Sequence, residues 1–148
     1  MSRRKIREHI FKLLFQMDFY DETELEEQLN LAIKEVEALL RPQAAPAEQE
    51  DGAEKKEEKA LAEIEEKLRD ICRHLPEIDA LIDEKATGWK TQRMAKVDLS
   101  LIRLAVYEIR FDENVPSSVA INEAVELAKR YGSDSSGAFV NGILAKMA

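Results

Sequence analysis

The sequence predicts an all-α protein of about seven helices, packed around one central helix at residues 97–111. Glycine and proline are scarce, 45% of the residues are hydrophobic, and no run alternates β-branched with polar residues, so we expect no strands. The stretch VDLSLIRLAVYEIRF is apolar around most of a helix, with a polar seam only at Arg103 and Arg110. Such a helix lies in a core or a bilayer, and this one is too short and too charged to span a membrane. We therefore expect it to be buried, with Asp98 capping its first turn.

The length, net charge and cysteine content of the chain limit its structural class and its partners. A length of 148 residues fits a single domain, and a formal net charge of −8 argues against a protein that coats nucleic acid indiscriminately. A local basic patch is compatible with that charge, because distant charges are screened within about 10 Å. Cys72 is the one cysteine, so no internal disulfide forms, and the N-terminus lacks the apolar segment of a secretory signal. We expect a cytoplasmic protein without a membrane segment.

The N-terminal segment combines a group of cations with two apolar lines. Four basic residues open the chain: Arg3, Arg4, Lys5 and Arg7. Apolar residues then recur at helical spacing: Ile6, Ile10, Leu13, Leu14 and Met17. A second line on the same helix holds Phe11, Phe15 and Phe19. Two lines indicate a helix that is sandwiched between layers or that meets a partner with its second line, and we favour the core interpretation.

A second amphipathic helix is predicted for residues 25–40. Thr23 and Glu26 have the spacing of a capping box at its start, and the residue before Pro42 ends it, because that residue is pushed out of the α region. Residues 42–59 have dense charge and no periodic apolar position. This composition is typical of disorder, so we expect a disordered acidic loop there. Its final six residues, EKKEEK, are also compatible with the start of the next helix.

A third helix is predicted for residues 60–75, and Pro76 then starts a new short helix. We place the boundary between two helical subdomains here, an N-terminal one at about 1–75 and a C-terminal one at about 76–148. Trp89 marks a bend before the central helix, and we expect it to be a packing anchor across that bend rather than a ligand platform.

The C-terminal part of the chain predicts two more helices. A broad apolar face covers residues 120–131, and Gly132 suits the left-handed residue that follows a helix end. The polar run from Ser133 to Ser136 offers several caps for a last helix. Its inward residues are Phe139, Val140, Ile143, Leu144 and Met147.

No constellation of catalytic residues is visible. The chain has no glycine-rich phosphate loop, no G-x-S-x-G motif and no Cys/His pair at metal-binding spacing, and His9 and His74 lack a second ligand three or four residues away. Glu108 falls on the apolar side of the central helix, where a buried carboxylate needs hydrogen bonds from a helix start or a basic side chain. We expect it to be structural, and we expect no enzymatic activity, no cofactor and no metal.

Two features are candidates for binding phosphate. The N-terminal cations fit an arginine-rich segment that grips RNA, although a frayed, charged terminus is the plainer alternative. The start of the last helix offers free N–H groups and the hydroxyls of Ser133 to Ser136, with Tyr131 and Phe139 near enough to stack bases. There the plainer alternative is self-capping. The two features form one site only if the ends of the chain meet in the fold.

Four segments together resemble the NusB family of bacterial transcription antitermination proteins: RRKIREHIFKLLFQ, VDLSLIRLAVYEIRF, VPSSVAINEAVELAKRYG and SSGAFVNGILAKM. The resemblance implies an all-helical fold of two perpendicular bundles and no catalysis. It implies binding of the boxA element of ribosomal RNA leader transcripts, jointly with the small-subunit ribosomal protein NusE. That pair then helps RNA polymerase, within an antitermination complex, to read through terminators.

The resemblance also implies site residues. RNA contacts fall on the four N-terminal cations, Arg3, Arg4, Lys5 and Arg7, and on a second set, Tyr131, Ser133, Ser136 and Phe139. The surface that faces NusE includes Phe15 and Asp98. Two positions depart from the family pattern: Ser135 stands where an acidic residue is frequent, and Ala138 where a basic residue occurs.

Two other classes of protein compete with an RNA-binding adaptor. A NusB-like domain also precedes the catalytic domain of ribosomal-RNA cytosine methyltransferases, but this chain stops at Ala148 without a cofactor-binding sheet, so we expect no methyl transfer from it. The other alternative is a helical protein–protein scaffold or a self-associating homodimer without an RNA role of its own. RNA binding with and without NusE discriminates between the adaptor and the scaffold.

Overall fold

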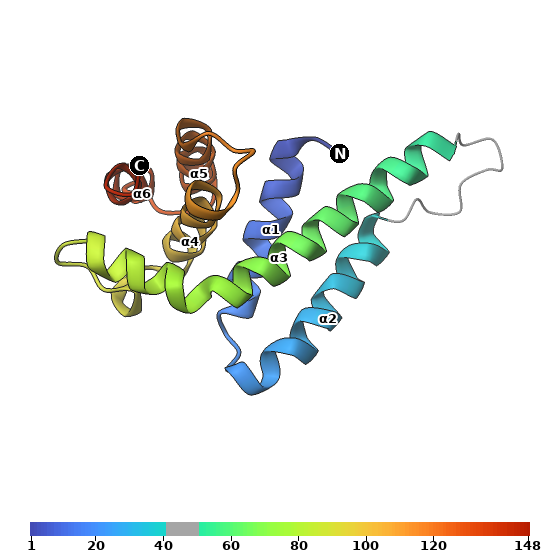
Figure 1. Cartoon of the computed structure of the whole chain (residues 1–148), viewed down its shortest axis with the longest axis horizontal. Helices are drawn as coiled ribbons and strands as arrows, with labels where there is room; N and C mark the ends of the chain where they lie inside the picture. Colours follow the sequence, from blue (N-terminus) through green and yellow to red (C-terminus); the bar gives the residue numbers. More distant parts are fainter. Residues whose placement is uncertain (41–50) are drawn as a thin grey trace. The chain divides into compact units, whose positions relative to one another are not determined.

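The structure, a computed structural model, describes residues 1–40 and 51–148 of the chain (Figure 1). The helices in these residues are α1 (Arg3–Met17), α2 (Glu22–Leu40), α3 (Asp51–Lys85), the 3-10 helix η1 (Thr91–Arg93), α4 (Lys96–Phe111), α5 (Ser117–Tyr131) and α6 (Ser136–Ala145). None of the described residues lies in a strand. The predicted all-α fold is confirmed, with six α-helices in the described part of the chain against about seven predicted.

The chain divides into two compact units, and the division falls inside α3. The N-terminal unit is Met1–Arg69 and the C-terminal unit is Asp70–Ala148. The perpendicular arrangement of two bundles that the family resemblance implies stays a prediction.

The N-terminal unit is built from α1, α2 and the first part of α3. The predicted apolar stripe of α1 is confirmed, since all five residues are buried: Ile6, Ile10, Leu13, Leu14 and Met17. Arg69 ties α3 to α2, because its guanidinium donates to Glu26 Oε1 at 3.0 Å and to Asn30 Oδ1 at 2.5 Å.

The second apolar line of α1 runs from the core to the surface. Phe11 is buried, Phe15 is half-buried, and Phe19 is 63% exposed. The Phe15 and Phe19 rings pack edge to face with their centroids 5.3 Å apart. The core interpretation is therefore right for Phe11 and wrong for Phe19.

The start of α2 differs from the predicted capping box. Asp21 is the capping residue, and its Oδ1 accepts hydrogen bonds from the N–H groups of Thr23 at 3.0 Å and Glu24 at 3.1 Å. The Thr23 hydroxyl also donates to this oxygen at 2.6 Å. That bond, with the two backbone N–H groups, holds the pKa of Asp21 below its usual value. The carboxylate of Asp21 is a stronger acceptor than the hydroxyl of Thr23, so the cap lies two residues earlier than predicted.

Two predictions about α3 are wrong. The predicted disordered loop at 42–59 is helical from Asp51 onward, and the rest of that prediction lies outside the described residues. Residues 54–59 are all lysine or glutamate, which favour helix, and continuation into the packed part of α3 stabilises this end of the helix.

The predicted helix break at Pro76 is also absent, because α3 runs through this residue to Lys85. Proline has no N–H for the carbonyl four residues earlier, which disfavours the interior of a helix. Pro76 is exposed, so its ring meets solvent. Buried residues on either side of it, Ile71, Ile78 and Ile82, hold both halves of the helix in the core. Tertiary packing here outweighs the local preference, and one long helix replaces two predicted ones.

The predicted central helix is confirmed as α4, which contributes ten buried residues to the C-terminal unit and packs against α5 and α6. Glu108 lies on its buried side as predicted, 1% exposed, and it has a polar partner within the chain. The polar groups of α4 are tied to neighbouring segments. Arg103 donates from Nε and Nη2 to the two carboxylate oxygens of Asp79, both at 2.8 Å, and the Tyr107 hydroxyl donates to Asp70 Oδ2 at 2.5 Å.

Asp98 does not cap α4 as predicted. The capping position is Ala95, which makes no side-chain hydrogen bond, and Asp98 lies within the first turn. Asp98 is 8% exposed, and its Oδ1 has no hydrogen-bond partner among the described residues. Its remaining contribution to the helix start is electrostatic, through the positive end of the dipole.

No helix within residues 1–40 and 51–148 has the length and apolar character needed to cross a membrane.

The bidentate Arg103–Asp79 pair generates a prediction about stability. Asp79→Asn should lower the free energy of unfolding by about 2 kcal/mol, because it removes the carboxylate charge that both hydrogen bonds to a mostly buried guanidinium depend on. Urea unfolding followed by circular dichroism measures the change. Glu84→Gln is the control, since Glu84 is exposed on the same helix, and a loss no larger than that of the control would contradict the prediction.

Candidate nucleic-acid interface

The first four cations of the chain form the ordered start of α1 rather than a frayed end. We call Arg3, Arg4, Lys5 and Arg7 the basic cluster. Ser2 caps the helix: its Oγ accepts from the N–H of Lys5 at 3.2 Å, and its carbonyl accepts from the N–H of Ile6 at 3.0 Å. The side chains of the cluster therefore project from a fixed helical backbone.

The charge of the basic cluster opposes the helix on which it stands. The first turn of α1 holds Arg3, Arg4 and Lys5 and no acidic residue. Positive charge there faces the positive end of the helix dipole, which is unfavourable by about 0.3–1 kcal/mol per exposed charge. An anion bound at this helix start removes the repulsion. The cluster is therefore better suited to a bound phosphate than to the isolated helix.

Ion pairs within the N-terminal unit orient parts of the cluster. Arg3 Nη1 pairs with Glu63 Oε1 on α3, and Lys5 Nζ lies 4.0 Å from Glu8 Oε2. Arg4 and Arg7 also have interaction partners in the chain. The Arg3 and Lys5 side chains stay mostly exposed, and exposed ion pairs of this kind are weak, so a phosphate can compete for these cations.

His9 lies two residues beyond the cluster on α1, and its surroundings disfavour the charged imidazolium. Burial lowers the pKa of His9 below the ordinary value of 6.5, and the nearby Lys12 ammonium lowers it further. The positive charge at this end of α1 therefore belongs to the arginine and lysine side chains and to the N-terminal ammonium of Met1, which lies 3.6 Å from Glu57 Oε1.

The second predicted set of residues lies around the turn between α5 and α6, in the C-terminal unit. Ser136 is 2% exposed, and its Oγ accepts from the N–H of Ser133 at 2.9 Å. This is the self-capping that the sequence left open, and it commits the Ser136 hydroxyl to the turn. Ser133 and Ser135 are exposed, with their hydroxyl oxygens 3.4 Å apart. The side chains of this turn that face solvent are therefore the hydroxyls of Ser133 and Ser135 and the carboxylate of Asp134 between them.

Gly132 is required in this turn for a different reason from the predicted one. Its φ of −95° and ψ of −165° are extended, so the predicted left-handed conformation is wrong. A Cβ at this position meets Ser136 Oγ at 2.4 Å and the carbonyl oxygen of Ala128 at 2.8 Å. The close approach of the end of α5 to the start of α6, not the backbone angle, excludes a side chain here.

Two aromatic rings flank the serine turn. Tyr131 is half-buried at the end of α5, with the Arg130 guanidinium carbon 5.2 Å from its ring centroid. Phe139 is half-buried on α6, and its ring meets that of Trp89 edge to face with centroids 5.2 Å apart. Trp89 packs against Phe139, as expected of a packing anchor, but half of its surface remains exposed, at 50%.

The two predicted sets of RNA contacts belong to different units. The basic cluster stands in the N-terminal unit, and Tyr131, Ser133, Ser136 and Phe139 gather at one turn of the C-terminal unit. Each set is local and ordered within its own unit. That they form one surface stays a prediction.

The residues predicted to face a protein partner differ in exposure. Phe15 is half-buried beside the exposed ring of Phe19, whereas Asp98 is buried and offers little area.

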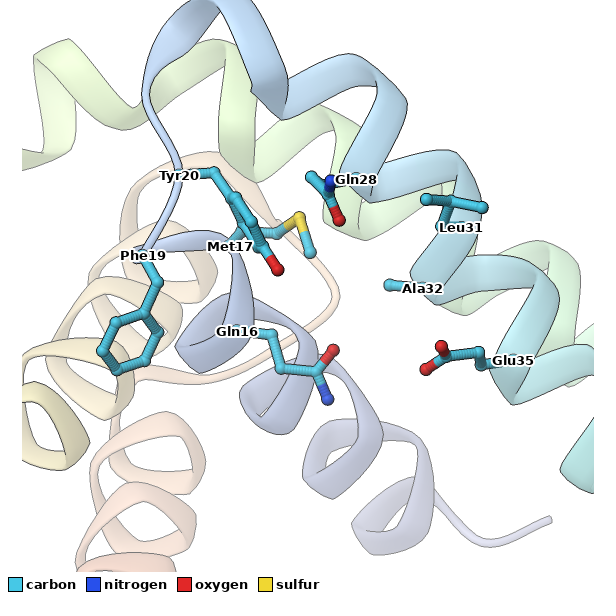
Figure 2. A pocket seen from close by; sticks show the side chains of 8 residues that line it. All are labelled: Gln16, Met17, Phe19, Tyr20, Gln28, Leu31, Ala32 and Glu35. Atoms are coloured by element: carbon cyan, nitrogen blue, oxygen red, sulfur yellow. The ribbon is translucent and has the colours of Figure 1, made fainter.

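A groove of about 430 Å³ opens beside Phe19, between the end of α1 and the middle of α2 (Figure 2). It is lined by Gln16, Met17, Phe19, Tyr20, Gln28, Leu31, Ala32 and Glu35. Gln16 on α1 and Glu35 on α2 point toward one another across it (Figure 2). Glu35 is the one carboxylate in its lining, so the groove holds no acid–base pair. Among residues 1–40 and 51–148, no group of three acidic, histidine or cysteine side chains is placed to hold a metal ion.

The fold and these residues define a small all-helical protein whose exposed polar groups suit phosphate. Comparison with known proteins gives its family. The model of the NusB family matches residues 4–148, and the chain therefore belongs to the NusB family.

Individual relatives match the chain along its length. It is 53% identical to the transcription antitermination protein NusB of Agathobacter rectalis, with 100% of each chain covered. It is 48% identical to the protein of that name from Lachnoclostridium phytofermentans, with 99% of this chain and 98% of the relative covered. The solved structure of T. maritima NusB shares 34% identity and superposes with a TM-score of 0.74, covering 100% of this chain and 91% of that one. The solution structure of NusB from Aquifex aeolicus, at 23% identity and a TM-score of 0.69, has the same fold.

The close packing at Gly132 generates a prediction. Gly132→Ala should lower the free energy of unfolding by about 2 kcal/mol, because the added Cβ forces the start of α6 away from α5. Gly142→Ala is the matched control on α6: a Cβ there meets nothing within 4 Å, so it should raise stability by about 0.5–1 kcal/mol. Thermal and urea unfolding of both variants measure the difference, and equal effects in the two would refute the packing argument.

Proposed function

We propose that the protein is a transcription antitermination factor that binds the boxA element of ribosomal RNA leader transcripts together with the ribosomal protein NusE. In this role it supports readthrough of terminators by RNA polymerase in the cytoplasm. The observation that carries the proposal is the basic cluster of α1, placed without any acidic residue against the positive end of the helix dipole in an otherwise acidic family member. Relatives that match the whole chain carry the name of transcription antitermination proteins.

The two sets of residues supply different parts of an RNA contact. Arg4 and Arg7, with Arg3 and Lys5, attract backbone phosphates through charge and contribute most to affinity. The exposed hydroxyls of Ser133 and Ser135 and N–H groups in the first turn of α6 donate hydrogen bonds to further phosphate oxygens. The rings of the second set are positioned to stack unpaired bases, as proteins do when they read single-stranded RNA.

The net charge of −8 limits how tightly the protein binds RNA alone. A few phosphate contacts on an acidic body give modest affinity, and a second subunit that completes the surface raises it. The half-buried Phe15 and the 63% exposed Phe19 offer an aromatic contact for such a subunit, which we assign to NusE.

Removal of cluster cations tests the RNA contact. The double variant Arg4→Ala, Arg7→Ala should bind boxA RNA more weakly and with a slope of log affinity against log salt reduced by about one per lost phosphate contact. Fluorescence anisotropy of a labelled boxA oligonucleotide at several salt concentrations measures both. Lys34→Ala, Lys59→Ala is the matched control, since it removes two exposed positive charges of the same unit outside the cluster. If the double variant and the control have equal RNA affinities and equal salt slopes, the basic cluster does not contact the RNA.

Binding with and without NusE separates the adaptor from a scaffold. We expect the protein and NusE together to retain boxA RNA at least about tenfold more tightly than this protein alone, and a scrambled oligonucleotide to gain less. Gel filtration and anisotropy follow the complexes. Assembly with NusE in the absence of RNA, with no gain in RNA retention by the pair, would instead indicate a protein–protein scaffold.

A further inference from the structure

We propose that Trp89 and Phe139 form a stacking site for one unpaired base of a bound single-stranded RNA, next to the serine turn of the C-terminal unit. This site rests on the proposed function and adds to it a residue, Trp89, that sequence analysis treated as a packing anchor. The ligand class is a nucleobase joined to a phosphate backbone.

The geometry of the ring pair leaves a free aromatic face. The rings of Trp89 and Phe139 lie at 75° with centroids 5.2 Å apart, so the edge of one ring contacts the face of the other. Trp89 is 50% exposed, and Phe139 is half-buried. An edge-to-face pair occupies one aromatic face at most, so ring surface remains available for a base. Base stacking on such a surface is strong and tolerates any base.

The backbone around Trp89 is held in place. Gly88 has a φ of +84°, a left-handed conformation that favours glycine, and it turns the chain directly before the indole. The N–H of Trp89 donates to the carbonyl of Ala86 at 3.0 Å, and the N–H of Thr91 donates to Asp83 Oδ1 at 2.8 Å. An aromatic side chain on an ordered turn loses little conformational entropy when it binds.

The charges around Trp89 favour an anionic ligand. The segment from Lys85 to Lys96 contains four cations and no carboxylate, in a chain whose net charge is −8. Lys90, directly after Trp89, is exposed, and Lys85, Lys90 and Arg93 have no ion pair among the described residues. An aromatic ring set among unpaired cations is the arrangement with which proteins hold single strands without reading their sequence. This basic stretch, with the one tryptophan in its middle, is the signal in the sequence that could have identified the site.

The pair adjoins the predicted phosphate contacts. Phe139 lies in the first turns of α6, and its N–H donates to the carbonyl of Ser135 at 3.0 Å. The connection between α3 and α4, which carries Trp89, and helix α6 lie on the same side of the C-terminal unit (Figure 1). A base stacked on Trp89 and Phe139 therefore leaves its backbone beside the exposed hydroxyls of Ser133 and Ser135. Trp89 extends that candidate site along α6.

The sole tryptophan reports directly on this contact. Titration of the full chain with an unlabelled boxA RNA oligonucleotide, with NusE present (or a tryptophan-free variant of it), should quench the emission of Trp89 in parallel with the anisotropy of labelled RNA. Trp89→Ala should weaken binding about tenfold or more, and Trp89→Phe by no more than about threefold, because a ring is retained. The salt slope of Trp89→Ala should equal that of the unmodified protein, since no phosphate contact is lost.

Val119→Ala is the matched control, because it also removes an exposed apolar side chain of the same unit, and it should bind RNA as the unmodified protein does. Circular dichroism checks the fold of each variant. Two results together would overturn the stacking site and leave the proposed function intact. The first is that RNA binds by anisotropy without any change in Trp89 emission, and the second is that Trp89→Ala has the same RNA affinity as Val119→Ala. Quenching of Trp89 emission by NusE in the absence of RNA would overturn the stacking site and indicate a contact with NusE instead. Absence of any boxA binding would overturn the proposed function itself.

Discussion

The burial of α4 is the constraint on which the rest of the C-terminal unit depends. A helix that is apolar around most of its circumference has to be covered on several sides, and α5 and α6 pack against it for this reason. The polar groups that α4 carries into the unit then need partners, which Asp79 provides for Arg103 and Asp70 for Tyr107. The turn between α5 and α6 is short because both helices are held against the same core. The candidate phosphate contacts at that turn are a consequence of how α4 is covered.

Charge is distributed unevenly over an acidic chain. Its cations concentrate where they are least favourable for the isolated helix, in the first turn of α1, and again between Lys85 and Lys96. Screening keeps the acidic residues elsewhere from cancelling these local fields. An overall negative charge disfavours indiscriminate binding to nucleic acid, whereas local positive fields permit binding at defined places. This combination suits an RNA-binding protein that works with a second subunit.

Tertiary packing or a competing residue overrode several predictions from local sequence patterns. Pro76 predicts a helix break, but buried isoleucines on both sides of it keep α3 continuous. Thr23 has the spacing of a cap, but the carboxylate of Asp21 two residues earlier takes that role with three hydrogen bonds. Gly132 fits a left-handed helix end by type and position, yet its backbone is extended and the residue is needed for space. The predicted break at Pro76, the predicted cap at Thr23 and the predicted conformation of Gly132 were therefore wrong, because each outcome depends on neighbours that a local pattern does not contain.

Periodicity along the chain was enough to locate most of the helices, though not the extent of α3. It was also enough to predict the buried stripe of α1, the central place of α4 and the buried position of Glu108, because each depends on spacing within one helix. Segment motifs were enough to indicate the family. Contacts between segments distant in the chain needed the fold: the burial of Ser136 under its own turn, the exposure of Phe19 at the end of a mostly buried line, and the meeting of Trp89 with Phe139. A side chain's exposure and neighbours depend on which helices cover it, and that information is spread over the whole core rather than held in any one stretch.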